Sequence, residues 1–165
     1  MQNLKNNTFK ILVIITAYVS AFEMAANPSF YVNNTEIVGV TSEDVDIYLG
    51  IPYAEPPIGS LRWEVTQPKI FDTNRFVADK FAPACMQGPR IVNWYKGVAA
   101  GFGGDPNYIK TPEISEDCLY LNMWVPNNLD NKEKIPVLIY IHGGSNRAGW
   151  SFEPNYIGKN LSRKG

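Results

Sequence analysis

His142, Gly143 and Gly144 carry the pattern in this chain that is most typical of a ligand-binding loop. They follow the apolar run 137–141, which predicts a strand covered on both faces. Consecutive glycines let the backbone turn sharply and bring N–H groups close to a ligand. We therefore expect a strand that ends in a glycine-rich loop. From these residues alone, a plain glycine-rich turn after a strand is the favoured interpretation.

His142 is the only histidine among the 165 residues, and the chain has two cysteines. A structural zinc site needs three or four clustered Cys or His ligands, so we expect no structural zinc. No other metal and no cofactor is predicted. A Ser–His–acid hydrolase needs a histidine as its base, so His142 can fill at most one role. Its place beside the glycines favours a hydrogen-bonded structural residue over a catalytic base.

Composition predicts a globular protein that does not bind nucleic acid. Hydrophobic residues make up 45% of the chain and charged residues 19%, which is typical of folded domains. The 15 Lys and Arg residues nearly balance the 16 Asp and Glu residues, giving a formal net charge of −1. A nucleic-acid binder would carry a basic stripe instead. The length suits one domain or slightly more.

The amino terminus has the order of regions found in a secretory signal peptide. Lys5 and Lys10 precede the apolar run 11–19, and small residues follow it. The run is shorter than the roughly 20 apolar residues that a transmembrane helix needs. We predict a signal peptide over residues 1–21, with cleavage as late as residue 26 as an alternative, and therefore a secreted or extracellular protein. A buried core helix or strand at the chain start is the alternative, and no later segment resembles a membrane span.

Export would change how two other features are interpreted. Cys85 and Cys118 become a candidate disulfide in an oxidising compartment, with two unpaired buried thiols as the alternative. The triplets that begin at Asn33 and Asn160 fit the N-glycosylation pattern and become candidate sites.

The rest of the chain is predicted to be short strands separated by turns. Segments 36–40, 45–49 and 118–125 are β-rich or alternate with period two. Glycines and prolines indicate a loop over 87–113, whose aromatic residues should pack onto the protein. A polar turn is expected at 127–132, and no long helix is evident. A weak helical start lies between Pro154 and Leu161.

Four blocks of this sequence together resemble the type-B carboxylesterases and cholinesterases. The third block is a highly specific signature, and the four follow the order of the family. They are Leu49-Gly50-Ile51-Pro52-Tyr53-Ala54-Glu55-Pro56-Pro57-Ile58-Gly59-Ser60-Leu61-Arg62-Trp63, Cys85-Met86-Gln87, Ser115-Glu116-Asp117-Cys118-Leu119-Tyr120-Leu121-Asn122-Met123-Trp124 and Val137-Leu138-Ile139-Tyr140-Ile141-His142-Gly143-Gly144.

The resemblance implies the amino-terminal portion of an α/β-hydrolase fold. This portion would contain initial antiparallel strands plus the strand that leads to the oxyanion loop. Aligned on the family's His-Gly-Gly-Gly loop, the oxyanion-hole N–H donors fall on Gly144 and Ser145, and Gly143 forms the turn. Ser145 replaces the third glycine. Its backbone N–H survives the change, but the loop conformation then depends on whether Ser can adopt the dihedral angles required there.

The resemblance also assigns a disulfide and an ion pair. Cys85 and Cys118 match the family's first disulfide, which closes a large loop over the entrance to the active site. Arg62 and Glu116 match a structural ion pair. In cholinesterases a Trp in the disulfide loop stacks on the choline ammonium. Counting back from Cys118, that position is Tyr108 here, so a generic ester is favoured over a choline ester.

The chain contains no Gly-x-Ser-x-Gly motif. In the family the nucleophilic Ser, the acid and the base all follow the oxyanion loop, so none is expected in this chain. We predict that residues 27–165 are the amino-terminal part of a hydrolase domain, truncated before the nucleophile, and inactive alone. The full-length parent would hydrolyse a small-molecule carboxylic ester through a Ser acyl-enzyme. Two alternatives are a non-catalytic cholinesterase-like adhesion or binding protein, and a short secreted binding protein.

Overall fold

The computed structural model describes residues 26–128 and 134–164. The predicted signal peptide over residues 1–21 lies outside the described residues, as does most of the polar turn expected at 127–132. No helix in the described ranges is both long enough and apolar enough to cross a membrane.

The first sheet contains β1 (Ser29–Val32), β2 (Thr35–Val38) and β5 (Arg75–Val77), in the order β1-β2-β5. β1 and β2 are antiparallel and are joined through Asn33, whose φ of 52° is a left-handed conformation that Asn tolerates. β5 returns from far along the chain and pairs with β2 in parallel. The strand expected at 36–40 is confirmed in part, because it is divided between β2 and the start of β3.

The second sheet is antiparallel and contains β3 (Val40–Ser42), β4 (Val45–Pro52) and β8 (Tyr120–Pro126). The strands predicted at 45–49 and 118–125 are therefore confirmed, with ends that differ by a few residues. The β4–β8 register shifts between Tyr48 and Ile51, where Gly50 adopts a φ of 67°. The Gly50 N–H donates to Asn122 Oδ1 at 2.9 Å, so a β8 side chain satisfies the backbone at this irregularity.

The main core lies between these strands. It is formed by the buried residues Ile37, Tyr48, Ile51 and Ala78, against which half-buried Phe30, Phe76 and Met123 pack. The rings of Phe30 and Tyr48 meet edge to face with centroids 5.0 Å apart. Burial does not alternate strictly in these strands: Ile37 and Val38 are both buried in β2, and Tyr48 and Ile51 of β4 enter the core three positions apart, across the register shift at Gly50.

The loop predicted over 87–113 is wrong for its first half, because α1 (Arg90–Gly101) is a helix of 12 residues. Val92 and Tyr95 lie three positions apart on one face of α1 and are buried, which is the spacing that helix packing requires. They form a second cluster with Ala84 and Trp150. The sequence predicted a loop here because Gly97, Gly101 and the flanking Gly and Pro residues are typical of loops, and they outweighed the helical spacing of the apolar residues.

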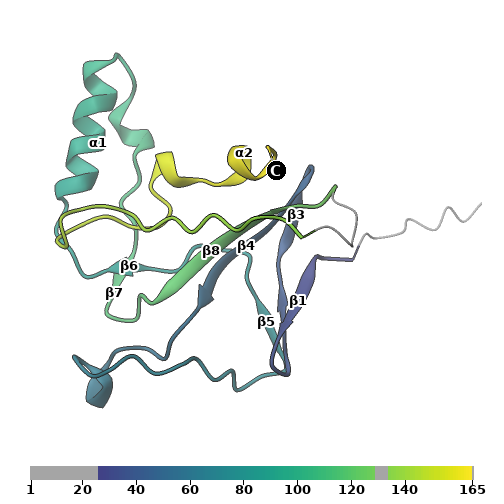
Figure 1. Cartoon of the computed structure of the whole chain (residues 1–165). Helices are drawn as coiled ribbons and strands as arrows, with labels where there is room; N and C mark the ends of the chain where they lie inside the picture. The colour runs from purple at the N-terminus through teal and green to yellow at the C-terminus, as the bar shows by residue number, and fades with distance from the viewer. Residues whose placement is uncertain (1–25, 129–133, 165) are drawn as a thin grey trace, which may run out of the picture.

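The remaining elements are short. β6 (Ala84–Cys85) and β7 (Ile114–Ser115) pair in parallel, and none of β5, β6 and β7 was predicted. The helical start expected between Pro154 and Leu161 is confirmed as two pieces, the 3₁₀ helix η3 (Pro154–Tyr156) and α2 (Lys159–Ser162). Two more 3₁₀ helices are η1 (Gly59–Leu61) and η2 (Pro106–Tyr108). Figure 1 shows α1 at one end of the molecule, away from β1 and β5 and beside the yellow carboxyl-terminal segment.

The strand predicted over residues 137–141 does not form in the structure. These five side chains are instead 62% to 85% exposed. A strand exists only as part of a hydrogen-bonded ladder, and no segment in the described part of the chain pairs with these residues. The apolar run therefore has the composition of a sheet interior without the neighbours that would bury it.

Candidate active site

The segment that follows His142 is a tight loop closed by its own backbone. The N–H groups of Arg147 and Ala148 donate to the Gly144 carbonyl at 3.1 and 3.2 Å. Gly144 has a φ of 136°, and a Cβ at this position would lie 1.6 Å from the Ala148 carbonyl oxygen. Only glycine fits at this position, because any side chain would collide with the returning backbone.

Ser145 and Asn146 both adopt left-handed backbone conformations, with φ values of 57° and 54°. This conformation costs an L-residue about 1–2 kcal/mol relative to glycine. Ser145 therefore carries a side chain at a position where the backbone favours glycine. Asn146 is better suited to the position, because Asn visits this region more readily than most residues.

His142 makes a local contact at the start of the loop. Its Nδ1 lies 2.9 Å from the carbonyl oxygen of Gly143, so the tautomer with a proton on Nδ1 donates to that oxygen. The ring is half-buried and lies close to Gly149, where an added Cβ would be 2.8 Å from Nδ1.

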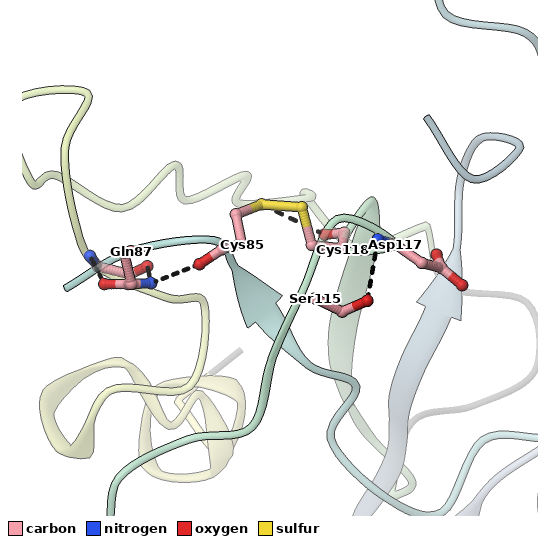
Figure 2. Close-up of a disulfide and its surroundings, with 6 residues drawn as sticks. Cys85, Gln87, Ser115, Asp117 and Cys118 are labelled. Carbon is pink, nitrogen blue, oxygen red and sulfur yellow. Dashed lines mark hydrogen bonds between the residues drawn. A yellow bond between two sulfur atoms is a disulfide. The ribbon is translucent and has the colours of Figure 1, made fainter. Parts of the chain in front are cut away.

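Gln87 connects this loop to the disulfide. Its Nε2 donates to the Gly149 carbonyl at 2.8 Å, and its Oε1 accepts from the Gly149 N–H at 2.8 Å. The same Nε2 also lies 3.1 Å from the carbonyl oxygen of Cys85. Figure 2 shows the Gln87 amide between its bonding partners, with the disulfide on the far side of Cys85. The sequence placed Gln87 in a family block but gave it no role.

The disulfide between Cys85 and Cys118 is confirmed, with Cα atoms 5.0 Å apart. It joins β6 to the residues that lead into β8, and Ser115 Oγ accepts the N–H of Asp117 beside it at 3.1 Å (Figure 2). Closing a loop of 33 positions stabilises the fold by about 3–4 kcal/mol in the chain-entropy account.

Arg62 Nη2 lies against the carboxylate of Glu116 and forms an ion pair with it. Both side chains are exposed, and pairs of this kind contribute about 0–1 kcal/mol. Glu116 is two residues from Cys118, so the pair attaches the segment after η1 to the disulfide region. This geometry is that of a structural contact.

The glycines of the loop border an open hollow of about 360 Å³. Gly143 and Gly144 form one side of this hollow, and Trp94 and Tyr95 of α1 form another. Arg90, Ile91, Glu153, Asn155 and Tyr156 complete the lining. Trp94 is 57% exposed, and Tyr95 meets its ring at 4.9 Å between centroids. Neither Ser145 nor Tyr108 lines the hollow.

Glu153 is a buried carboxylate that the sequence did not single out; it is 4% exposed. It accepts the Trp150 N–H at 3.1 Å and the Tyr95 hydroxyl at 2.8 Å. Burial and this bond to Glu153 raise the pKa of Tyr95 well above its ordinary value. Asn155 Nδ2 also donates to the Tyr95 oxygen at 3.3 Å. The only sequence signal was an acid directly before Pro154, which is common where a helical turn begins.

Asn33 and Asn160 are both exposed and lie on separate elements, in the β1–β2 turn and in α2. Neither contributes to the hollow. The structure therefore brings together Gly143, Gly144, Gln87 and the Cys85–Cys118 disulfide, and keeps the candidate glycosylation sites apart from them.

The antiparallel strands and the Cys85–Cys118 disulfide agree with the amino-terminal portion of an α/β-hydrolase fold that the sequence predicts. The chain belongs to the carboxylesterase family, whose sequence model matches residues 27–165. It is 34% identical over 142 residues to phenmedipham hydrolase of Pseudarthrobacter oxydans, covering 86% of this chain and 27% of that protein. It is 37% identical over 119 residues to mouse cholinesterase, covering 72% of this chain and 18% of the relative.

Solved structures give the same result. A PNB esterase matches with a TM-score of 0.70 and 28% identity, over 83% of this chain and 25% of the esterase. A second, thermophilic PNB esterase matches with the same score and identity. These neighbours are esterases with the α/β-hydrolase fold. The chain spans about a quarter of the length of the first relatives it matches.

Proposed function

We propose that this chain supplies the oxyanion-binding part of a secreted carboxylic ester hydrolase that works through a Ser acyl-enzyme. The observation that supports it is the backbone of Gly143 and Gly144 at the edge of the hollow, in a chain of the carboxylesterase family. When a nucleophile attacks an ester, the carbonyl oxygen becomes negative. N–H groups of Gly144 and Ser145 stabilise that charge, and one such donor contributes roughly 3 kcal/mol to lowering the barrier.

The nucleophile, acid and base are proposed to lie outside these 165 residues. The one histidine, His142, directs Nδ1 at the Gly143 carbonyl rather than at a serine. A Ser–His–acid mechanism needs a histidine within hydrogen-bond distance of the nucleophile. The chain alone is therefore expected to hydrolyse no ester.

The substrate is proposed to be a small-molecule carboxylic ester that is not a choline ester. The names of the relatives include a cholinesterase, a fumonisin B1 esterase and a phenmedipham hydrolase, so they share no single substrate. Tyr108, the position that matches the choline-binding Trp, is 81% exposed and lies outside the hollow. No nucleic-acid partner is proposed, given the net charge of −1.

A chimeric enzyme tests this proposal. Residues 27–165 replace the matching quarter of phenmedipham hydrolase, and hydrolysis of p-nitrophenyl acetate is followed by absorbance. We expect the chimera to turn over this ester, whereas the 165-residue chain alone shows only the buffer rate. A chimera that melts cooperatively but lacks turnover would contradict the proposal and favour the non-catalytic binding protein.

Ser145→Ala in the same chimera separates a backbone donor from a nucleophile. The substitution removes the hydroxyl and keeps the N–H, so the expected kcat is within about twofold of the parent chimera. Loss of all turnover would show that the Ser145 hydroxyl takes part in the reaction.

Export and glycosylation are proposed on separate grounds. The Cys85–Cys118 disulfide suits an oxidising compartment, and both Asn33 and Asn160 are exposed. Expression of the chain in a secreting eukaryotic cell should release a product whose mass falls on treatment with an N-glycosidase. A product retained in the cytosol with free thiols would contradict the assignment of a signal peptide.

A further inference from the structure

Two hydrogen bonds of the Gln87 side chain join it to one residue, Gly149, in the way that residues of adjacent strands are joined. One N–H···O bond runs in each direction at 2.8 Å, so the carboxamide replaces a neighbouring peptide group. Only a side chain with a donor and an acceptor on one planar group can make this pair. Glu has the same shape but offers no donor to the Gly149 carbonyl when ionised.

Gly149 touches the beginning of the loop that it ends. It is buried and has a φ of 110°, and an added Cβ would lie 2.5 Å from the Gly143 carbonyl oxygen. The first and last residues of the loop are therefore in backbone contact. Fixing Gly149 in space therefore constrains the backbone at Gly143, directly before Gly144 and Ser145.

The other end of this connection is the disulfide. Gln87 lies two positions after Cys85 and donates to its carbonyl at 3.1 Å, and Cys85 is bonded to Cys118 next to β8. A continuous series of covalent and hydrogen bonds thus runs from the antiparallel sheet through Gln87 to the loop.

We propose that Gln87 is a positioning residue that holds the oxyanion loop in place through Gly149. The catalytic consequence rests on the proposed function, because it needs Gly144 and Ser145 to be the donors. The holding of the loop by Gln87 does not depend on that function, so the two can be tested apart.

Amide hydrogen exchange in the 165-residue chain tests the holding of the loop. Gln87→Glu removes the donor and brings a negative charge to the Gly149 carbonyl. The variant loses the bonds that Nε2 donates to the Gly149 and Cys85 carbonyls. This loss should speed exchange in the peptide that covers 143–150 by about tenfold or more. Peptides from β4 and β8 should exchange as in the parent.

Gln67→Glu is the matched control. Gln67 is exposed, and its Nε2 donates to the Val65 carbonyl at 2.9 Å, so the same chemical change occurs far from the loop. Exchange over 143–150 should not change in this variant. Gln87→Met, which has similar length and no charge, is the second variant in case the carboxylate unfolds the chain.

Two outcomes would overturn the proposal. Unchanged exchange over 143–150 in both Gln87 variants would show that the loop holds itself. Equal loss of protection in β4 and β8 would show that Gln87 serves the whole fold and not the loop.

The chimera gives the catalytic readout. Gln87→Glu should lower kcat at least tenfold with KM changed less than twofold, because misdirected donors weaken transition-state binding, whereas Gln67→Glu should change neither. An inactive parent chimera together with faster loop exchange in Gln87→Glu would refute the proposed function and keep the positioning role. An active chimera whose kcat is insensitive to Gln87→Glu would refute the positioning role alone.

Discussion

The carboxylate of Glu153 is the most demanding polar group near the loop, because it is buried and needs donors. Tyr95 and the Trp150 N–H supply them. A buried charge that loses a hydrogen-bond donor bears an uncompensated cost of desolvation. The arrangement of the side chains that line the hollow therefore depends on the Tyr95 hydroxyl as well as on Gly143 and Gly144.

Tyr95→Phe removes that hydroxyl and leaves the ring in place. We expect the free energy of unfolding to fall by about 1–3 kcal/mol, because Glu153 keeps its burial and loses a donor. Urea unfolding followed by tryptophan fluorescence measures the change. Tyr108→Phe, at a site that is 81% exposed, is the control and should alter stability by less than about 0.5 kcal/mol. Equal effects of the two substitutions would contradict the importance of the Tyr95–Glu153 bond.

The ionisation of Tyr120 should make the stability of the protein depend on pH in the alkaline range. Burial, the hydrogen bond to Asp117 and the Asp117 charge raise the pKa of Tyr120 to about 12. The neutral form is thus favoured in the folded state, while the unfolded chain titrates near pH 10. Its contribution to stability is complete below pH 10 and is lost as the pH rises from about 10 to 12.

Tyr120→Phe should flatten the fall of unfolding free energy between pH 10 and 12. Urea unfolding at several pH values in this window measures the slope for both proteins. Identical slopes would mean that the Tyr120 hydroxyl titrates alike in the folded and unfolded chains.

At the scale of elements, β8 is the strand that organises the site. It pairs with β4, and its Asn122 side chain accepts from Gly50 and donates to Ser151 Oγ at 2.9 Å. One amide thus joins the irregular point of β4 to the segment after the glycine loop. The alternating pattern at 118–125 predicted the strand, but the partners of Asn122 come from positions 72 and 29 residues away.

The apolar segment over 137–141 should promote self-association of the 165-residue chain. Ile139→Lys places a charge in the middle of it and should reduce light scattering on concentration and heating. Ile139 is 80% exposed, so the unfolding free energy should change by less than about 0.5 kcal/mol. Val65→Lys is the matched control, because Val65 is equally exposed but lies outside this segment. Equal scattering by the Ile139 variant and the parent would show that another surface aggregates.

Over the whole molecule, the disulfide connects parts that secondary structure alone leaves apart. β6 and β7 pair over only two residues each, and α1 lies within the loop that Cys85 and Cys118 close. The buried cluster of Ala84, Val92, Tyr95 and Trp150 joins α1, inside this loop, to one residue before the loop and one after it.

Replacing both cysteines by serine should lower the unfolding free energy by about 3–4 kcal/mol. Urea unfolding of parent and variant measures the difference, and peptide mapping by mass spectrometry of the parent should find Cys85 linked to Cys118. Free thiols at both positions in protein from an oxidising compartment would contradict the closed loop.

Local pattern in the sequence was enough to locate β4, β8, the glycine loop and the family. The alternation of apolar and polar residues in 45–49 and 118–125 predicts a half-buried strand without any knowledge of the strand that pairs with it. The cysteine pairing followed from the resemblance, and the family itself is confirmed by the match over residues 27–165. These features depend on residues close in the chain or on blocks long enough to be specific.

Only the tertiary structure decided α1, the roles of Gln87 and Glu153, and the state of residues 137–141. The apolar face of α1 is defined by its packing against Trp150. The importance of Gln87 follows from its hydrogen bond to the Gly149 carbonyl, at 2.8 Å. The apolar run at 137–141 has the composition of a strand, but a strand forms only with a partner in the ladder. Composition and periodicity are local properties, whereas burial and hydrogen-bond pairing join residues that are distant along the chain.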